Sequence, residues 1–427
     1  MARPIVYDLV RLVLSAMRST PRGIERIDLG YALHLFETWP EDCIGLLPTP
    51  WGVRGFSRET VLKARPYFDT AWRETIADGD DPVLAAAVAG PGRGGPLPDL
   101  GTRRKHPGLA GIARLLMTTG IPLGRSFRSF PQGALYLNIG HDGLTYPALV
   151  WWLRQRPDLL PVFMIHDVIP LSHAQYVEPA SHRRHRTVLD HTARHAHLVI
   201  VPSHAAGGDV RVELQRRSAR DIPIHAAPLP ITDNFIEAGL GQRPAPLLDT
   251  PYFVVCGALE PRKNHAVVFA AWRALAAEAG ERTPILFVAG SRGSLSGSIS
   301  VELDALVASG LPVRWLDGLS TPGLIRLIQG ARALLMPSLV EGFGLPVAEA
   351  LALGTPALVS DIPAHREAGS DGACYLPPGD SGAWVDAISS LTFDDAAFAA
   401  AQARAQATPV RSWPTYLEGI TGVLKGL

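Results

Sequence analysis

The stretch Pro337-Ser338-Leu339-Val340-Glu341-Gly342-Phe343-Gly344-Leu345-Pro346-Val347-Ala348-Glu349 decides how the second half of the chain folds. Residues 333–336, just before it, form an apolar run with the length of a buried strand. After it, Pro346 suits the first position of a helix and Gly354 marks the end of that helix. The stretch therefore predicts a strand, a glycine-bearing loop and a helix.

Two carboxylates belong to this motif, because Glu341 lies in the loop and Glu349 lies one turn into the helix. The backbone amides of Phe343, Gly344 and Leu345 would point at whatever lies in front of that helix. A helix N-terminus favours anionic or hydroxyl-rich ligands, since it carries a partial positive charge. Taken alone, the motif fits a sugar-nucleotide site and an ordinary strand-to-helix turn equally well.

The totals favour a large α/β protein with more than one core. At 427 residues the chain is too long for a single core, so we expect two domains. The net charge of +0 argues against bulk binding of nucleic acid. The 3 cysteines, Cys43, Cys256 and Cys374, are scattered without C-x-x-C spacing. We therefore expect buried free thiols in a reducing compartment rather than disulfides or a zinc site.

The N-terminal region and one internal segment bear on location. Asp8 and Arg11 interrupt the first apolar run, so no signal-peptide core forms, and no apolar segment reaches transmembrane length. A cytoplasmic protein, soluble or peripheral at the inner membrane face, is expected. In the segment 103–128, basic residues flank a short apolar helix. Such a segment docks on anionic lipid or packs on the core, and packing is the commoner case.

Apolar runs alternate with helical patterns in both halves, which predicts two doubly wound sheets facing each other across a cleft. The strands expected in the first half are 5–9, 134–138, 159–165, 197–203 and 223–228, and those in the second are 252–257, 285–290, 313–318, 333–336, 357–360 and 373–376. The predicted domains are 1–235 and 251–410, joined by a linker at 232–250, with 411–427 as a terminal helix crossing back to the first domain.

Ligands bind at the carboxyl ends of the strands in such folds, and the candidate polar groups all fall there. They are Gly23, His141 and His166 in the first domain and Arg262, Lys263, Glu341 and Glu349 in the second. Arg262 and Lys263 form a diphosphate clamp, because arginine grips phosphate as a fork and lysine acts as a point charge. These charges would stabilise a leaving nucleoside diphosphate. Asn264 is placed to cap the following helix.

Several other chemistries are disfavoured. The chain carries no P-loop, and the first strand-to-helix turn of the second domain, residues 257–261, is not a Gly-x-Gly-x-x-Gly fingerprint, which argues against a dinucleotide cofactor. No Asp-x-Asp is placed to hold a metal-bound diphosphate, so cationic side chains would replace the metal. The histidines between 182 and 195 have helical spacing, but neighbouring arginines repel a metal, and a solvated helix face is expected. Those histidines are His182, His185, His191 and His195.

With these motifs in place, the chain resembles the GT-B-fold retaining glycosyltransferases of family 4 across nearly its whole length. The run 341–349 looks like the E-x7-E signature of that family, and Glu260-Pro261-Arg262-Lys263-Asn264-His265 resembles its phosphate loop. Gly23-Ile24-Glu25-Arg26 and His166-Asp167-Val168-Ile169-Pro170 are similar to a mannosyltransferase-like branch that makes bacterial surface polysaccharides. The resemblance implies metal-independent transfer of a hexose from a nucleotide-diphosphate sugar to a glycan or lipid-linked acceptor, and it favours GDP-mannose.

The resemblance also implies roles for the second-domain residues. Arg262 and Lys263 would bind the donor diphosphate. Glu349 would bind the ribose hydroxyls, and Glu341 would bind the donor sugar. The amides of residues 343–345 would contact the sugar or the phosphate.

In the first domain, His166 would touch the transferring sugar and the acceptor, and Gly23 would let the first loop approach the diphosphate. The helix from Ser412 would cross back. Two departures from the family pattern concern the phosphate site. Ala258 stands where many members have Arg, and Arg22 stands where relatives often have Thr.

The mechanism that the resemblance implies is front-face displacement, in which a donor phosphate oxygen takes the proton of the acceptor hydroxyl and no protein nucleophile acts. Two other functions stay open. A non-hydrolysing nucleotide-sugar epimerase uses a similar two-domain fold and needs no acceptor. A non-catalytic nucleotide-sugar-binding subunit would keep the fold, but the paired glutamates and the Arg-Lys loop argue against it.

Overall fold

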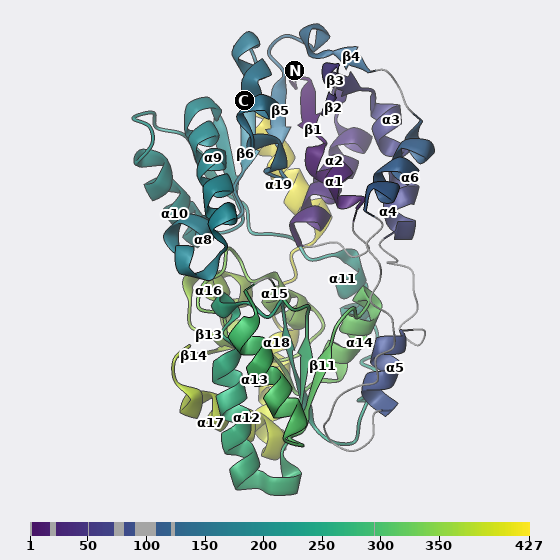
Figure 1. The fold of residues 1–427 in the computed structure, drawn as a ribbon. Coiled ribbons are helices and arrows are strands. Elements are labelled where there is room, and N and C mark those ends of the chain that lie inside the picture. Colours follow the sequence, from purple (N-terminus) through teal and green to yellow (C-terminus); the bar gives the residue numbers. More distant parts are fainter. Residues whose placement is uncertain are drawn as a thin grey trace.

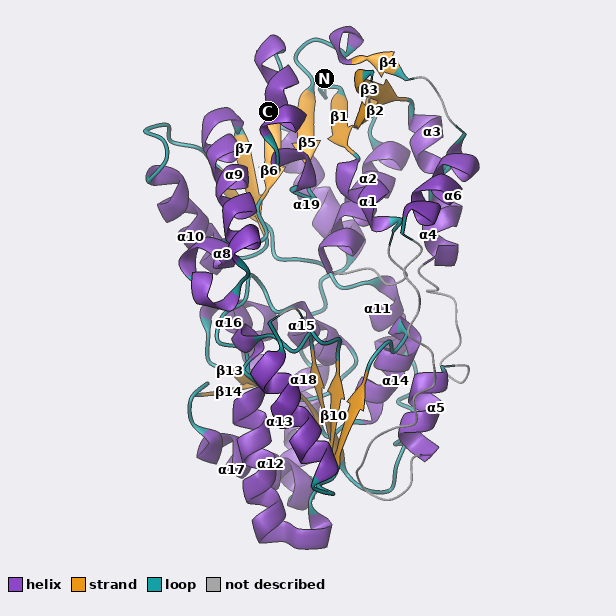
Figure 2. Cartoon of the chain, viewed as in Figure 1, coloured by secondary structure: helices purple, strands orange, loops and turns teal. Residues whose placement is uncertain are grey.

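The protein consists of two α/β domains, one above the other in Figure 1, each built on its own sheet. A computed structural model describes residues 2–17, 23–49, 51–71, 81–89, 108–120, 124–293 and 295–427. Arg22 and part of the segment 103–128 lie outside these ranges. Figure 2 shows the strands of both sheets lying between helices, as a doubly wound fold requires.

The first sheet has eight strands in the order β4-β3-β2-β1-β5-β6-β7-β8. Their bounds are β1 Ile5–Asp8, β2 Cys43–Thr49, β3 Gly52–Phe56, β4 Arg125–Ser126, β5 Leu135–Asn138, β6 Leu160–Met164, β7 Leu198–Val201 and β8 Ile224–Ala226. The five strands predicted from the sequence pair in parallel, as expected. Strand β2 extends the parallel part, and β3 and β4 add an antiparallel edge that the sequence did not reveal.

The second sheet has six strands in the order β11-β10-β9-β12-β13-β14, and every pair is parallel. Their bounds are β9 Tyr252–Cys256, β10 Ile285–Ala289, β11 Val313–Leu316, β12 Ala333–Met336, β13 Ala357–Ser360 and β14 Ala373–Leu376. All six strands predicted for this half are present, and the last three have the predicted bounds.

The α-helices cover both faces of each sheet. Those before β9 are α1 Val10–Ser15, α2 Gly23–Thr38, α3 Arg58–Leu62, α4 Arg65–Ala71, α5 Pro82–Ala89, α6 Leu109–Thr119, α7 Pro147–Val150, α8 Ile169–Ser172, α9 Pro179–His195, α10 His204–Gln215 and α11 Asp233–Leu240. Those after it are α12 His265–Ala279, α13 Gly297–Ala308, α14 Thr321–Gly330, α15 Leu345–Ala352, α16 Pro363–Gly369, α17 Ser381–Phe393, α18 Asp395–Gln406 and α19 Trp413–Lys425.

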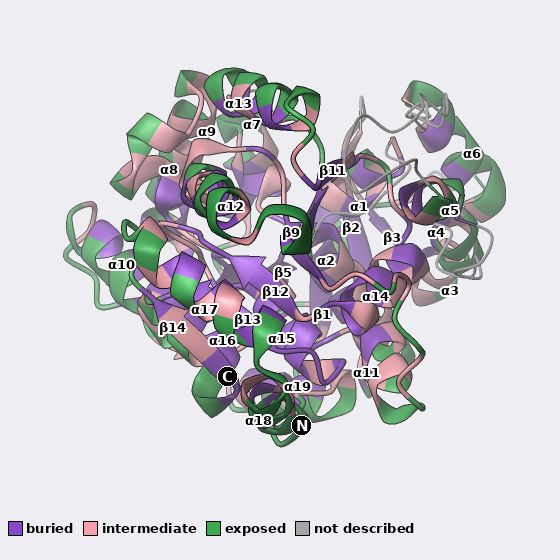
Figure 3. Ribbon diagram, turned by 90° about the horizontal axis from the view of Figure 1, so that it is seen from below, coloured by how far each residue is buried: buried purple, intermediate pink, exposed green. Residues whose placement is uncertain are grey.

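Strand β9 shows how the second core is built. Its alternate side chains Tyr252 and Val254 join one buried cluster, whereas Phe253 and Val255 join another on the opposite face. There Phe253 meets the ring of Trp272 edge-on, with 5.8 Å between the ring centroids. Burial on both faces explains why strands of this sheet are continuous apolar runs. Figure 3 shows these strands buried, whereas the outer faces of α12 and α13 are exposed.

Helix α5 comes early in the chain but packs on the second domain, beside α14 and β11 (Figure 1). The Asp81 carboxylate accepts hydrogen bonds from the amides of Val83 (2.9 Å) and Leu84 (3.0 Å), which cap this helix. It also accepts one from the amide of Ser320 in the second domain (2.7 Å). The predicted range 1–235 therefore contains a helix that lies on the other sheet.

Replacing Asp81 by alanine is expected to destabilise the protein by about 1–3 kcal/mol, because three amide donors lose a charged acceptor. Equilibrium urea unfolding would measure the change. The exposed Asp386 offers a matched control, since its replacement by alanine should stay within about 0.5 kcal/mol. Equal midpoints for the two variants would contradict the bridging role of Asp81.

The last helix, α19, lies on the first domain against α2. The hydroxyls of Tyr31 and Tyr416 are 2.6 Å apart, and their rings meet edge-on. Gly30 leaves the space that the Trp413 indole fills, since a Cβ there would lie 2.4 Å from a ring atom. The chain thus passes from the first domain to the second and returns.

Two segments differ in part from their predictions. Helix α11 occupies part of the predicted linker, and Phe235 in it is fully buried. Helix α6 was expected to pack on the core, and it buries Leu115 but exposes 78% of Leu109 and 74% of Met117. Within the described ranges, no helix is both long enough and apolar enough to cross a bilayer.

Candidate active site

The loop after β12 and the loop after β9 share one buried carboxylate. Glu341 Oε1 accepts from Lys263 Nζ at 2.6 Å, and Oε2 accepts from Arg262 Nη1 at 2.9 Å. Ser338 Oγ also donates to Oε1 at 2.7 Å. The amide of Leu339 donates to the carbonyl of Arg262 at 2.8 Å, which ties the two loops together. The sequence-predicted clamp and the first glutamate are therefore in direct contact.

The charges in this cluster hold one another ionised. Burial alone would raise the pKa of Glu341, but Lys263 and Arg262 outweigh it, and the pKa falls to about 2. Burial would lower the pKa of Arg262, yet the glutamates Glu341 and Glu260 raise it. An anionic ligand that reached the two cations would compete with Glu341 for them. The protein thus holds these two cations against an internal carboxylate.

Asn264 was predicted to cap α12, and that prediction is wrong. Its backbone is left-handed, with φ at 54°, and its side-chain amide donates instead to the carbonyls of Pro337 (3.0 Å) and Pro378 (2.8 Å). Asn tolerates this conformation better than other non-glycine residues. Asn264 therefore fixes the loop before Glu341 relative to the loop that carries Arg262 and Lys263.

The glycine-bearing loop leads into α15 as predicted. Gly344 stands just before the helix at φ 97°, a conformation that favours glycine, and Pro346 lies in the first turn. A Cβ at Gly344 would also lie 2.8 Å from His365 Cδ2. Phe343 is buried, and the helix ends before Gly354, at φ 67°. The amides of residues 343–345 thus stand at the helix N-terminus.

Glu349 is buried on α15, and its one cationic contact among the described residues comes from the first domain. Arg26 Nη1 of α2 lies 3.9 Å from Glu349 Oε1, and Nη2 donates to Thr321 Oγ1 at 2.8 Å. Burial raises the pKa of Glu349, and Arg26 opposes that rise. Arg26 belongs to a motif that the sequence singled out, but it received no role there.

His166 follows β6 and lies against the glycine loop of the other domain. A Cβ at Gly342 would come within 2.5 Å of the His166 carbonyl oxygen. His166 Nε2 is 2.9 Å from the carbonyl of Ile139, which can only accept, so Nε2 carries the proton and Nδ1 keeps its lone pair. Burial lowers the pKa of His166 to about 4. The imidazole is therefore neutral at physiological pH.

Two further histidines surround His166. The ring of His141, a residue at φ 67°, lies 4.9 Å from that of His166, and its Nε2 accepts from the His166 amide at 3.3 Å. His185 Nε2 donates to the carbonyl of Asp167 at 2.8 Å. The prediction of a solvated histidine face on α9 is thus wrong for His185, and also for His191, which is buried.

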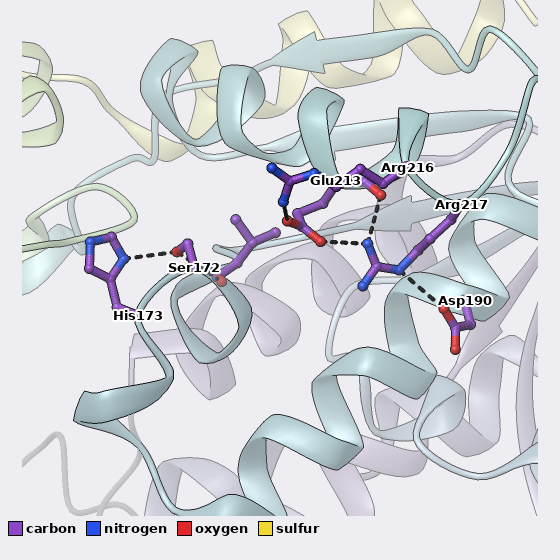
Figure 4. A network of polar contacts seen from close by, with 7 residues as sticks. Ser172, His173, Asp190, Glu213, Arg216 and Arg217 are labelled. Carbon is purple, nitrogen blue, oxygen red and sulfur yellow. Dashed lines mark hydrogen bonds and ion pairs between the residues drawn. The ribbon is translucent and has the colours of Figure 1, made fainter.

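Arginines and acids of α9 and α10 form ion pairs near His185. Figure 4 shows Glu213 between Arg216 (2.6 Å) and Arg217 (2.5 Å), and Arg217 also reaches Asp190 at 3.1 Å. Burial lowers the pKa of His185 and Asp167 opposes that shift, whereas Arg217 and Glu213 make smaller contributions that lower and raise it. Within the described ranges, no group of three or more His, Cys, Asp or Glu side chains is arranged to hold a metal ion.

A second contact between the domains lies at the start of α10. Ser203 Oγ donates to the carbonyl of Gly342 at 2.7 Å. The Glu367 carboxylate of α16 accepts from the amides of His204 and Ala205, each at 2.7 Å. Gly23, at the start of α2, lies near α15, since a Cβ there would be 3.9 Å from a Leu345 methyl. First-domain residues therefore approach the glycine loop and α15 from several elements.

Beneath this site, α2 carries a buried acid, Asp28. Tyr7 donates to its Oδ1 at 2.5 Å, while Oδ2 has no hydrogen-bond partner in the described part of the chain. Burial raises the pKa of Asp28 from 3.8 to about 8, although Tyr7 and Arg11 oppose the rise. The folded protein therefore binds a proton here that the unfolded chain releases near pH 4.

Because the folded pKa is the higher one, this stabilising proton is present at low pH and lost as the pH rises from about 4 to about 8. The slope is at most about 1.4 kcal/mol per pH unit for one proton. Asp28→Asn is expected to lose less stability than the unmodified protein between pH 5 and pH 8.5, as thermal unfolding would show. Asp386→Asn, at an exposed site, should keep the original slope.

Comparison with known proteins identifies the second half of the chain. Residues 250–394 match the family described as glycosyl transferases group 1. This region is a group 1 glycosyltransferase domain. The group 1 domain contains β9 to β14, the loops that carry Arg262, Lys263 and Glu341, and helix α15 with Glu349.

Curated relatives share part of the chain. The serotype-specific mannosyltransferase WbdA of Escherichia coli is 30% identical over 228 residues, which are 50% of this chain and 27% of that protein. The O-antigen chain mannosyltransferase RfbU of Salmonella typhimurium is 43% identical over 79 residues, which are 18% of this chain and 22% of that protein. The chain thus spans about a quarter of the length of these two relatives.

Solved structures share the fold over most or all of the chain. The UDP-forming α,α-trehalose-phosphate synthase of Burkholderia xenovorans aligns with a TM-score of 0.60 at 14% identity, covering 100% of this chain and 99% of that one. HepE of Anabaena, solved in complex with UDP-glucose, aligns with a TM-score of 0.53 at 16% identity, covering 69% and 79%. The two-domain fold around the group 1 domain is therefore GT-B, as the sequence predicted.

Proposed function

We propose that the chain is a retaining, metal-independent hexosyltransferase of surface polysaccharide synthesis. It would move a sugar, with mannose favoured, from a nucleotide-diphosphate donor to a hydroxyl of a glycan or lipid-linked acceptor. The observation that carries the proposal is the contact of Arg262 and Lys263 with Glu341, next to the N-terminus of α15 and opposite His166. Mannose is supported by the names of the relatives.

The second domain would hold the donor. Arg262 and Lys263 would exchange part of their contact with Glu341 for the diphosphate, and so stabilise the charge that develops as the diphosphate leaves. The freed oxygens of Glu341 would then accept hydroxyls of the donor sugar. Glu349, buried one turn into α15, would accept the ribose hydroxyls, while the amides of residues 343–345 face the sugar or phosphate.

The first domain would present the acceptor. The neutral His166, with a lone pair on Nδ1, can accept a hydrogen bond from a sugar hydroxyl. The acceptor oxygen forms a bond to the anomeric carbon on the face from which the diphosphate departs. The bond between that carbon and the phosphate oxygen breaks, and a phosphate oxygen of the donor takes the acceptor proton. No protein nucleophile or metal takes part in this scheme.

We place the reaction in the cytoplasm, at the inner membrane face. Contact with the membrane is supported by α6, which exposes Leu109, Met117 and Arg114. Apolar and cationic side chains on one short helix suit an anionic lipid surface. Co-sedimentation of the protein with vesicles containing phosphatidylglycerol measures this contact. Equal recovery of the protein with neutral vesicles would contradict the preference for an anionic surface.

The function itself is tested by incubating the protein with GDP-mannose, and separately with UDP-sugars, in the presence and absence of a lipid-linked acceptor. Nucleotide release that depends on acceptor supports transfer, and product NMR reports whether the anomeric configuration is retained. Activity that survives EDTA supports the absence of a metal. Release of an epimerised sugar without acceptor would favour the epimerase, and binding without turnover would favour a non-catalytic subunit.

A further inference from the structure

Arg26 reaches from the first domain into the nucleotide half of the cleft. It lies on the first turn of α2, one turn after Gly23, and its side chain is only 16% exposed. The two groups that it contacts, Glu349 of α15 and Thr321 of α14, both belong to the group 1 domain. The cost of removing the arginine charge from water between two domains must be offset by the groups that the arginine contacts.

The guanidinium of Arg26 uses separate nitrogens for its two contacts. Nη1 faces Glu349 Oε1 at 3.9 Å, and Nη2 donates to Thr321 Oγ1 at 2.8 Å. Because the guanidinium is planar and rigid, the two contacts together fix the position of the Arg26 charge relative to the Glu349 carboxylate. The remaining Nε is buried and has no hydrogen-bond partner in the part of the chain described.

The surroundings of Glu349 otherwise disfavour its charge. Its side chain is 8% exposed, and burial raises its pKa more than Arg26 lowers it. Two titratable groups interact with it electrostatically among the described residues: Arg26 from α2 and the Cys256 thiol of β9, whose own pKa is raised to about 12. Since that thiol stays neutral, Arg26 supplies the charge that favours the Glu349 carboxylate.

We propose that Arg26 is a positioning residue, contributed by the first domain, that keeps Glu349 ionised and oriented for the ribose hydroxyls of the donor. The inference rests on the proposed function, because it takes Glu349 as the ribose-binding group. A carboxylate can accept from two vicinal hydroxyls, whereas a protonated carboxyl loses part of that capacity. The ribose site is then complete only when both domains contribute to it.

Calorimetric titration with GDP and UDP between pH 6.5 and pH 9 tests the inference. Arg26→Met should weaken the tighter nucleotide by roughly tenfold at pH 6.5, because Glu349 then loses the cation that favours its ionised form. The deficit should shrink toward pH 9, because hydroxide then ionises Glu349 without help from Arg26. At each pH, the affinity of the unmodified protein is divided by that of Arg26→Met for the same nucleotide. This ratio cancels the titration of the phosphate, which affects both proteins equally.

Three further proteins make the test specific. Thr321→Val keeps the cation but removes its second contact, so it should weaken binding less than Arg26→Met does, and Arg26→Lys should retain most of the affinity at pH 6.5. Glu349→Gln should bind weakly with no recovery at high pH. With 2′,3′-dideoxy-GDP, the unmodified protein and Arg26→Met should bind equally, since the ribose hydroxyls are missing.

The outcomes separate the two proposals. If Glu349→Gln binds as tightly as the unmodified protein, the ribose role of Glu349 in the proposed function is lost. If Glu349→Gln is weak but Arg26→Met matches the unmodified protein, or is equally weak at every pH, the Arg26 inference fails alone. If Arg26→Met does not fold, Arg26→Lys replaces it in the test. An equal loss of nucleotide affinity by Arg26→Lys at every pH would then overturn the inference.

Discussion

Replacing Glu341 by glutamine is expected to lower kcat by about 10²- to 10³-fold, the usual effect of removing one oriented polar group from a transition-state site. Glutamine can still accept from Ser338, but it offers no negative charge to Arg262 and Lys263. The donor sugar would then lose a charged acceptor for its hydroxyls. Initial rates with the donor that the unmodified protein accepts would measure the loss.

The same variant should bind the free nucleoside diphosphate at least as tightly as the unmodified protein. In the free protein, Glu341 forms ion pairs with both cations, Arg262 and Lys263. Its loss therefore removes a group that competes with the diphosphate for them. Glu260→Gln is the matched control, because Glu260 contacts only the Nε of Arg262 (3.0 Å) and is more exposed. A Glu341 variant with near-normal transfer would refute the donor-site assignment, and weaker nucleotide binding would refute the competition.

The second sheet was predictable because its strands are buried on both faces. Residues 333–336 are an unbroken apolar run, and residues 357–359 form another that ends at Ser360. Such short runs between loops favour buried strands. Strand β2, in contrast, contains Gly45 and Pro48, which local propensity assigns to turns. Its pairing with β1 and β3 supplies the hydrogen bonds that the local pattern does not indicate.

The candidate site was likewise predictable from the sequence only in part. Arg262, Lys263 and Glu341 follow strands of one sheet, so the rule that parallel strands end at a common edge brings them together. The contacts of Arg26 and Glu367 depend on how two separate domains meet, and no local pattern encodes that orientation. Asn264 shows a further limit, because its left-handed backbone turns the side chain toward two loops instead of the helix.

The meeting of the domains gives the second large prediction, for Gly342→Ala. A Cβ at this position would lie 2.5 Å from the His166 carbonyl oxygen and 3.1 Å from Asp167 Cβ. A rigid backbone carbonyl cannot yield as a flexible side chain can, so the first-domain loop must move away. The added methyl would also disturb the hydrogen bond from Ser203 to the Gly342 carbonyl.

Transfer by Gly342→Ala is expected to fall by about 10²-fold, since a misplacement of about 1 Å between reacting groups has that effect. Circular dichroism and nucleotide binding should change little, because the collision is with the other domain and the group 1 domain would keep the diphosphate contacts proposed for it. Gly379→Ala, whose Cβ would meet no atom within 4 Å, should transfer normally. Normal transfer by Gly342→Ala would mean that His166 and the glycine loop need not be in contact during the reaction, and the acceptor side would then have to be assigned to other first-domain residues.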